Sequence, residues 1–123
     1  MADQKSDKKK PHLSTHVLDT CRGIPASELP VQLFVFANET WILLKESLTN
    51  SNGRCEDFLE NEASSLSPGR YKLHFKVDRY FDTLKITSMY PCIDVIFQVN
   101  DSQDHYHVPL LLGPFGYTTY RGS

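Results

Sequence analysis

The chain has 123 residues, a length that suits one domain with a single core. It is 40% hydrophobic and 23% charged, with seven Phe and six Tyr, which is typical of a folded globular protein and excludes a disordered chain. The formal net charge of -2 provides no overall attraction for nucleic acid or for an anionic membrane, so neither is expected as a partner.

Two features of the chain bear on its location and domain boundaries. It contains no apolar run of the roughly 18 residues that span a bilayer, and its first residues lack the apolar core of a secretory signal, so we expect an intracellular protein. Residues 1–10, MADQKSDKKK, include four lysines and are almost entirely polar. We therefore expect a disordered basic tail over 1–10 and a folded domain over 11–123.

The three cysteines are Cys21, Cys55 and Cys92. They are odd in number and lie far apart, without the close pairs of a zinc site or the density of a secreted disulfide scaffold. We expect them to be reduced thiols.

The first half of the domain reads as short strands separated by turns. Residues 12–18 predict a strand that ends at the Gly23-Ile24-Pro25 break, and residues 31–37 and 40–48 predict a hairpin, because they are rich in β-branched and aromatic side chains. A turn at residues 50–53 leads to a brief strand at Arg54 and Cys55, followed by a polar connection over residues 56–67.

The second half of the domain continues the pattern with one interruption. Residues 70–77 alternate apolar and polar side chains, which predicts a strand with one buried face. The spacing of Tyr80, Phe81 and Leu84 then predicts a short helix over 78–86, with Asp78 as its N-cap. Further strands are predicted over 92–99, 106–112 and 115–120. Eight short strands and one helix predict a mainly β, two-sheet sandwich.

Three histidines are the side chains best suited to moving protons near neutral pH. His105 and His107 lie two residues apart on a predicted strand and so project from the same face, while His16 lies on the first strand. The same three imidazoles could hold a tetrahedral zinc ion with one position open for water. A zinc-dependent hydrolase or zinc-binding module is therefore an alternative to metal-free acid-base chemistry.

Two further features are candidates for substrate contact. Arg54 follows an Asn-Gly turn, where its guanidinium could offer a fork of donors to a carbonyl or an anion. Residues 117–123 are polar and aromatic up to Ser123. This segment could be an edge strand that finishes a sheet, or it could bring the Tyr120 hydroxyl, Arg121 and a terminal carboxylate into a site.

Four segments together resemble the 5-hydroxyisourate hydrolases of the transthyretin-related family. They are the run Thr15-His16-Val17-Leu18-Asp19 with Gly23-Ile24-Pro25, the turn Thr49-Asn50-Ser51-Asn52-Gly53-Arg54, the strand His105-Tyr106-His107-Val108-Pro109-Leu110-Leu111-Leu112, and the end Tyr120-Arg121-Gly122-Ser123. The final tetrapeptide is similar to a signature of the enzymes that the hormone carrier transthyretin lacks. Asn52, where many relatives have Asp, is a mild departure.

The resemblance implies a transthyretin-like β-sandwich and a cofactor-free enzyme that hydrolyses 5-hydroxyisourate to 2-oxo-4-hydroxy-4-carboxy-5-ureidoimidazoline. It implies catalytic roles for His16, Arg54, His107 and Ser123, with no metal ligand. It also implies that the substrate is bound by His16, Arg54, His105, Tyr120 and Arg121. The resemblance also implies a homotetramer with sites at the dimer-dimer interface.

A transthyretin-like carrier that binds a small molecule without turnover is the alternative of a different class. For location, the resemblance implies the peroxisome or the cytoplasm. The chain ends in Arg-Gly-Ser and so lacks the Ser-Lys-Leu peroxisomal address.

Overall fold

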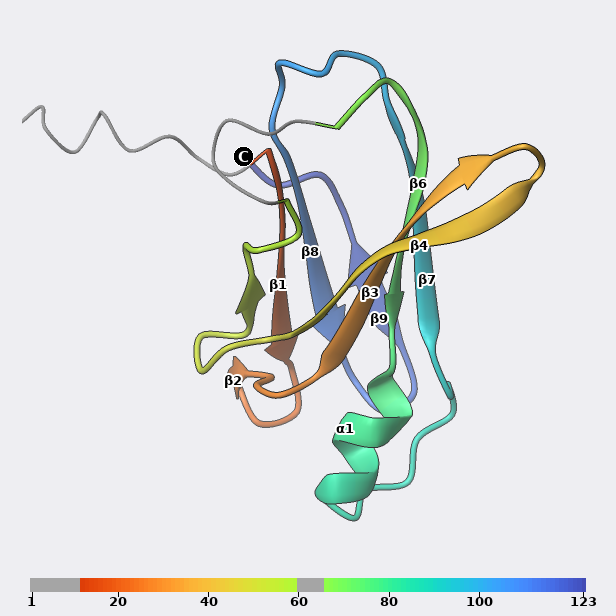
Figure 1. Ribbon diagram of the computed structural model, residues 1–123. Helices are drawn as coiled ribbons and strands as arrows, with labels where there is room; N and C mark the ends of the chain where they lie inside the picture. The colour runs from red at the N-terminus through yellow and green to blue at the C-terminus, as the bar shows by residue number, and fades with distance from the viewer. Residues whose placement is uncertain (1–11, 60–65) are drawn as a thin grey trace, which may run out of the picture.

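A computed structural model describes residues 12–59 and 66–123, so the predicted tail over residues 1–10 lies outside the described residues. Within the described part, nine strands form two sheets that pack face to face, with one helix at one end (Figure 1). The predicted mainly β, two-sheet sandwich is therefore confirmed.

The first sheet has the strand order β2-β1-β8-β9, and β5 also pairs with β1. Its strands are β1 (Leu13–Asp19), β2 (Ile24–Pro25), β5 (Arg54–Cys55), β8 (Tyr106–Leu112) and β9 (Tyr117–Thr119). The central pair β1 and β8 is parallel, whereas the other pairs are antiparallel. The parallel pair brings segments about 90 residues apart in sequence into register, from Leu13 beside Tyr106 to Asp19 beside Leu112.

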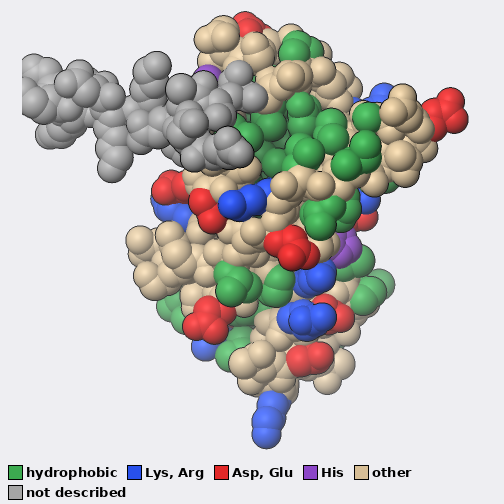
Figure 2. Space-filling model, viewed as in Figure 1, with side chains coloured by type: hydrophobic (Ala, Val, Ile, Leu, Met, Phe, Trp, Pro, Cys, Tyr) green, Lys and Arg blue, Asp and Glu red, His purple; other side chains and the backbone are tan. Residues whose placement is uncertain are grey.

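The second sheet is antiparallel, with the order β4-β3-β6-β7. Its strands are β3 (Pro30–Ala37), β4 (Thr40–Leu48), β6 (Gly69–Phe75) and β7 (Ile93–Val99), and α1 (Val77–Thr83) follows β6. The β3–β4 hairpin projects beyond the sandwich, and apolar side chains gather beside it, where β4 exposes three consecutive apolar residues (Figure 2). These are Ile42, Leu43 and Leu44.

Alternation along the strands decides which side chains form the core and which face outward. On β1 and β8 the inward side chains are fully or almost fully buried, as are those of β6 opposite them. They include Leu13, Val17, Val108, Leu110, Leu73 and Phe75. Burial of one such aliphatic or aromatic side chain contributes about 1.5–3 kcal/mol to folding. Because the core fixes which side chains of β1 and β8 point inward, the intervening residues of these strands must point away from the core.

Two local predictions at the start of the helix were wrong. The predicted strand over 70–77 stops at Phe75, and α1 begins at Val77 because the Arg79 amide donates to the carbonyl of Lys76 and closes the first turn. Asp78 is therefore not the N-cap: Lys76 holds that position without a side-chain bond, and Asp78 lies in the first turn.

The segment predicted as a break after the first strand contains a short strand. Ile24 and Pro25 pair with Asp19 and Leu18 as β2, at the edge of the sheet, where a residue without an amide hydrogen is tolerated. The last strand is shorter than its predicted range of 115–120, since only Tyr117–Thr119 pairs with β8.

The described residues contain no disulfide: Cys21 is exposed, Cys92 is half-buried and Cys55 is buried. Burial raises the pKa of the Cys55 thiol to about 11, so this group stays protonated and unreactive at neutral pH. In the same described ranges, no helix has the length and apolar character needed to cross a membrane.

Candidate active site

The outer face of the first sheet brings together three of the predicted site residues. His16 on β1 is the register partner of Arg54 on β5. On the other side of β1, Ser14 is the register partner of His107 on β8. Paired residues project from the same face of a sheet, and Ser14 and His16 are two apart on one strand. His16, Arg54 and His107 therefore share one polar face with Ser14.

A tight turn places Arg54 beside β1. The Asn50 side-chain oxygen Oδ1 accepts hydrogen bonds from the backbone amides of Asn52 and Arg54, at 2.9 and 3.0 Å. Gly53 has a φ of +76°, and a Cβ at this position would lie 2.5 Å from the carbonyl oxygen of Val17. Only glycine fits here without displacing backbone, so the sequence Asn-Ser-Asn-Gly fixes where Arg54 leaves the turn.

The His107 ring is held by β1 and by the C-terminal segment. Its Nδ1 lies 2.8 Å from Oγ of Ser14. The Gly122 amide donates to the carbonyl of His107 at 2.8 Å, forming an isolated β-bridge. A Cβ on Gly122 would lie 2.5 Å from ring atom Cδ2 of His107 and 3.1 Å from Cγ of Pro109. The imidazole therefore fills the space that any larger residue at position 122 would need.

The electrostatic environment favours neutral histidines. Burial lowers the pKa of His107, and Arg54, His16 and His105 lower it further, while Glu56 acts in the opposite direction. Burial likewise lowers the pKa of His16, followed by the charge of Arg54, with a backbone interaction at Asn52 partly offsetting both. Both imidazoles are thus neutral at neutral pH and can accept a proton.

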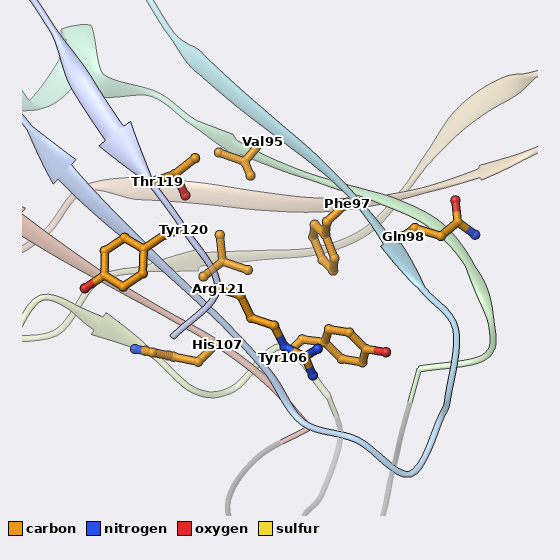
Figure 3. A pocket seen from close by; sticks show the side chains of 9 residues that line it. Val95, Phe97, Gln98, Tyr106, His107, Thr119, Tyr120 and Arg121 are labelled. Carbon is orange, nitrogen blue, oxygen red and sulfur yellow. The ribbon is translucent and has the colours of Figure 1, made fainter. Parts of the chain in front are cut away.

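Two other predicted site residues are close in sequence to residues of this face: Tyr120 lies two residues before Gly122, and His105 lies two residues before His107. Tyr120 is 54% exposed, and its ring extends away from Phe97 on the same side as the His107 ring (Figure 3). His105 directly precedes β8, and its Nε2 is buried without a hydrogen-bond partner among the described residues.

The Arg121 side chain takes a different direction. Its guanidinium carbon lies 4.6 Å from the centroid of the Tyr106 ring, and Nη2 donates to the carbonyl of His105 at 3.1 Å (Figure 3). Tyr106 faces the core, so in the single chain Arg121 is not brought together with His16 and Arg54. Ser123 follows Gly122 and is exposed.

A cavity of about 240 Å³ lies beneath the C-terminal segment, between β7 and β8. Its lining is mainly apolar and includes Val95, Phe97, Tyr106, Val108 and Thr119, and His107 borders it. The polar face with His16 and Arg54 is separate from this cavity, since neither residue lines it. His107 and the C-terminal segment therefore border both regions.

The zinc alternative requires a set of side chains that converge on one point. Across residues 12–59 and 66–123, no group of three or more His, Cys, Asp and Glu side chains is placed to hold a metal ion. The site geometry instead consists of imidazoles that share a face with a guanidinium.

Comparison with known proteins identifies the family. A profile of the HIUase/Transthyretin family matches residues 13–122. The chain belongs to this family. It is 43% identical to a 5-hydroxyisourate hydrolase of Mus musculus over 113 residues, which cover 90% of this chain and 94% of that protein.

Solved structures of an enzyme and of a carrier share the fold of this chain. The chain superimposes with a TM-score of 0.80 and 33% identity on a 5-hydroxyisourate hydrolase of Klebsiella pneumoniae, covering 92% of this chain and 99% of that one. It superimposes with a TM-score of 0.83 on sea bream transthyretin in complex with thyroxine, at 23% identity and covering 90% and 94% of the two chains. The second likeness shows the shared fold alone, whereas the two relatives at 43% and 33% identity carry the name 5-hydroxyisourate hydrolase.

Ser14, Glu56 and the contact of Gly122 with His107 were missing from the sequence-based predictions. Ser14 lies two residues before His16 on one strand, so strand alternation alone would have placed both on the same face. Gly122 was predicted only as part of the terminal tetrapeptide, and its contact with the His107 ring has no signal in the sequence. Glu56, close enough to raise the pKa of His107, lies in a segment predicted to be a polar connection.

Proposed function

We propose that the protein hydrolyses 5-hydroxyisourate to 2-oxo-4-hydroxy-4-carboxy-5-ureidoimidazoline, a step of urate degradation. The observation that carries the proposal is the pair of imidazoles with lowered pKa that shares one sheet face with a guanidinium. Membership of the family and the identity to named hydrolases support the same reaction.

The reaction breaks a cyclic amide, and the residues of this face supply what it needs. One neutral imidazole, that of His16 or His107, takes a proton from water as the water oxygen bonds to the ring carbonyl carbon. Arg54 binds the carbonyl oxygen and stabilises the negative charge that develops on it. The carbon-nitrogen bond then breaks, the nitrogen receives a proton, and the carbonyl carbon becomes a carboxylate. No cofactor is needed for these steps.

The residues around this group have supporting roles in the proposal. The Tyr120 hydroxyl and His105 contact the substrate, and Ser123 orients a histidine or relays a proton. Arg121 also binds substrate, which requires its guanidinium to leave the ring of Tyr106. Its 60% exposed side chain and its 3.8 Å separation from Asp104 allow such a movement at small cost.

The proposal includes a homotetramer whose sites lie at the dimer-dimer interface. Two observations on the single chain support it. The polar face is the outer side of a sheet, so a second subunit packed against it would enclose the substrate away from bulk water. In the described part of the chain, β7 pairs with β6 alone and β9 with β8 alone, so each sheet has an edge available to a second subunit.

Dilution tests this assembly. Specific activity should fall as the tetramer dissociates, followed in parallel by light scattering. Full specific activity in a species with the mass of one chain would contradict an interfacial site.

The proposed enzyme domain spans residues 11–123. We infer that the enzyme acts in the cytoplasm or the peroxisome, the two locations that the resemblance to the hydrolases implies. Imaging a fluorescent fusion beside a peroxisomal marker separates the two locations.

The function is tested with 5-hydroxyisourate generated in place from urate by urate oxidase. Its decay is followed optically with and without the protein, because the substrate also decays spontaneously. Decay accelerated by the protein, unchanged by EDTA and accompanied by the expected product in NMR spectra, supports the proposal. A folded tetramer that binds small molecules but leaves the decay rate unchanged would instead be a transthyretin-like carrier.

A further inference from the structure

The His107 ring has a buried polar partner that the proposed mechanism has not used. Ser14 is only 6% exposed, and its Oγ lies 2.8 Å from Nδ1 of His107. A hydroxyl this deeply buried costs folding free energy unless it is hydrogen-bonded, so the contact is a defined interaction and not a chance approach. It leaves Nε2 as the ring nitrogen that can act on a substrate.

The role of His107 as a general base requires that Nδ1–H is the donor and the Ser14 oxygen the acceptor in this hydrogen bond. A neutral imidazole carries its proton on one nitrogen, and a general base needs its lone pair on the nitrogen that faces water. If the Ser14 oxygen accepts from Nδ1–H, the lone pair is on Nε2. The same bond persists after Nε2 takes up a proton, because Nδ1 remains a donor in the imidazolium.

We propose that Ser14 is a positioning residue that accepts a hydrogen bond from Nδ1–H of His107 and thereby holds the lone pair on Nε2, and that Gly122 fixes the same ring from its Cδ2 edge. This proposal rests on the proposed hydrolase function.

Gly122 restricts the His107 ring to one of its two orientations. Its backbone lies so close to the imidazole that a Cβ would come within 2.5 Å of Cδ2 of His107. Turning the ring over would exchange Nδ1 and Cδ2, removing the hydrogen bond to Ser14 and placing the nitrogen against the Gly122 backbone. The hydroxyl on one edge and the glycine on the other thus select one of the two ring orientations.

The tautomer is measured directly by ¹⁵N NMR of the histidine rings in the intact enzyme. We expect Nδ1 of His107 to be protonated and Nε2 to be unprotonated at neutral pH in the wild type. In Ser14→Ala, the proton should redistribute toward Nε2, and kcat should fall about tenfold, the effect of losing one hydrogen bond of ordinary strength. KM should stay within about twofold, because Ser14 is only 6% exposed and acts through the His107 ring.

Ser14→Thr keeps the hydroxyl and should restore both the wild-type tautomer and most of kcat. Thermal unfolding of each variant shows that the protein assayed is folded. A wild-type His107 with its proton on Nε2 would overturn the proposal, as would a Ser14→Ala enzyme with unchanged kcat and tautomer.

Gly122→Ala tests the other edge of the ring, with Gly116→Ala as the matched control. A Cβ on Gly116 meets nothing within 4 Å, and Gly116 is not among the glycines with positive φ. We expect Gly122→Ala to change the His107 ring signals and lower kcat tenfold or more, and Gly116→Ala to stay within twofold of wild type. Unchanged signals and kcat in Gly122→Ala would overturn the role of Gly122. A wild type without hydrolysis would refute the proposed function, while the NMR result would still decide the tautomer.

Discussion

The outer faces of the two sheets carry the same kinds of side chain in different electrostatic situations. On the second sheet, His74 donates to the carboxylate of Asp94 at 2.6 Å. Nζ of Lys72 lies 4.8 Å from the Phe34 ring centroid and 4.6 Å from that of Trp41, in cation-π contact with both. Each of these polar groups is satisfied by an acidic or aromatic neighbour.

On the first sheet, the histidines are grouped with positive charge instead. Arg54 lowers the pKa of both His16 and His107, after the effect of burial. Among the described residues, no ion pair joins either histidine or Arg54 to a carboxylate. A histidine and a cation on a sheet face therefore do not in themselves form a site. Chemistry requires that their neighbours leave the imidazole neutral and the guanidinium available for a substrate.

Removal of an imidazole from the first sheet should have the largest effect on activity. His16→Asn or His107→Asn should lower kcat/KM about 10²- to 10⁴-fold for whichever residue is the general base, because the amide cannot accept a proton from water. His74→Asn on the second sheet is the matched control and should remain within about twofold of wild type. The measurement is the initial rate of 5-hydroxyisourate decay, corrected for the spontaneous reaction. Wild-type rates in both site variants would remove the two imidazoles from the mechanism.

Replacing the guanidinium should have the next largest effect. Arg54→Lys keeps the positive charge but loses the planar pair of donors, so kcat/KM should fall about 10²-fold, the cost of one well-placed donor to a developing oxyanion. Arg70→Lys, whose guanidinium lies over the Phe36 ring on the second sheet, is the corresponding control. Equal activity of the two variants would show that Arg54 acts as a charge alone.

The pH dependence of the wild-type kcat/KM tests the protonation state of the two histidines without any substitution. The pKa values of His16 and His107 both lie below the ordinary 6.5, so the neutral form of the base predominates at pH 6.5 and above. We expect kcat/KM to reach a plateau above neutral pH and to decrease as the pH falls through the lowered pKa, by about tenfold per unit if one neutral histidine is needed. A half-maximal rate above pH 6.5 would contradict the lowered values.

A network outside the site gives the smallest expected effect on activity. Asp19, which is 1% exposed, accepts from the Tyr80 hydroxyl at 2.7 Å and from Nε of Arg22 at 3.2 Å. Burial by itself raises the pKa of Asp19, but the hydrogen bonds from Tyr80, Arg22 and the Cys21 amide outweigh it and lower the pKa. The resulting stability is present above the ordinary value of 3.8 and is lost as the pH falls through the lower folded-state value.

Tyr80→Phe should therefore reduce the free energy of unfolding by about 1–3 kcal/mol while leaving hydrolysis unchanged. Denaturant titration at pH 7 measures the loss, and exposed Tyr117→Phe should stay within about 0.5 kcal/mol of wild type. A large loss of activity in Tyr80→Phe without loss of stability would extend the site to this end of β1.

The sequence allowed most of the fold to be predicted because alternation and turn residues are local signals. The hairpin over residues 31–48 and the strand at 106–112 follow from them directly. The pairing of Ile24 with Asp19 and the start of α1 at Val77 depend on hydrogen bonds that a local pattern does not contain.

For the site, the resemblance supplied His16, Arg54 and His107, and the structure places these three on one face. Ser14 was missed, and Gly122 was predicted only within the terminal tetrapeptide, because their contacts with His107 arise from parallel pairing and a chain reversal between distant segments. The direction of Arg121, toward Tyr106, depends on packing in the same way.

The most direct test of the central claim compares two variants in one assay. The double variant Arg70→Lys/His74→Asn changes a cation and a histidine on the second sheet, whereas the double variant His16→Asn/His107→Asn changes both histidines on the first. Decay of 5-hydroxyisourate should proceed at nearly the wild-type rate with the second-sheet variant and at close to the spontaneous rate with the first-sheet variant. Loss of activity in the second-sheet variant with retention in the first-sheet variant would contradict the account, because it would place the hydrolytic site on the other face of the sandwich.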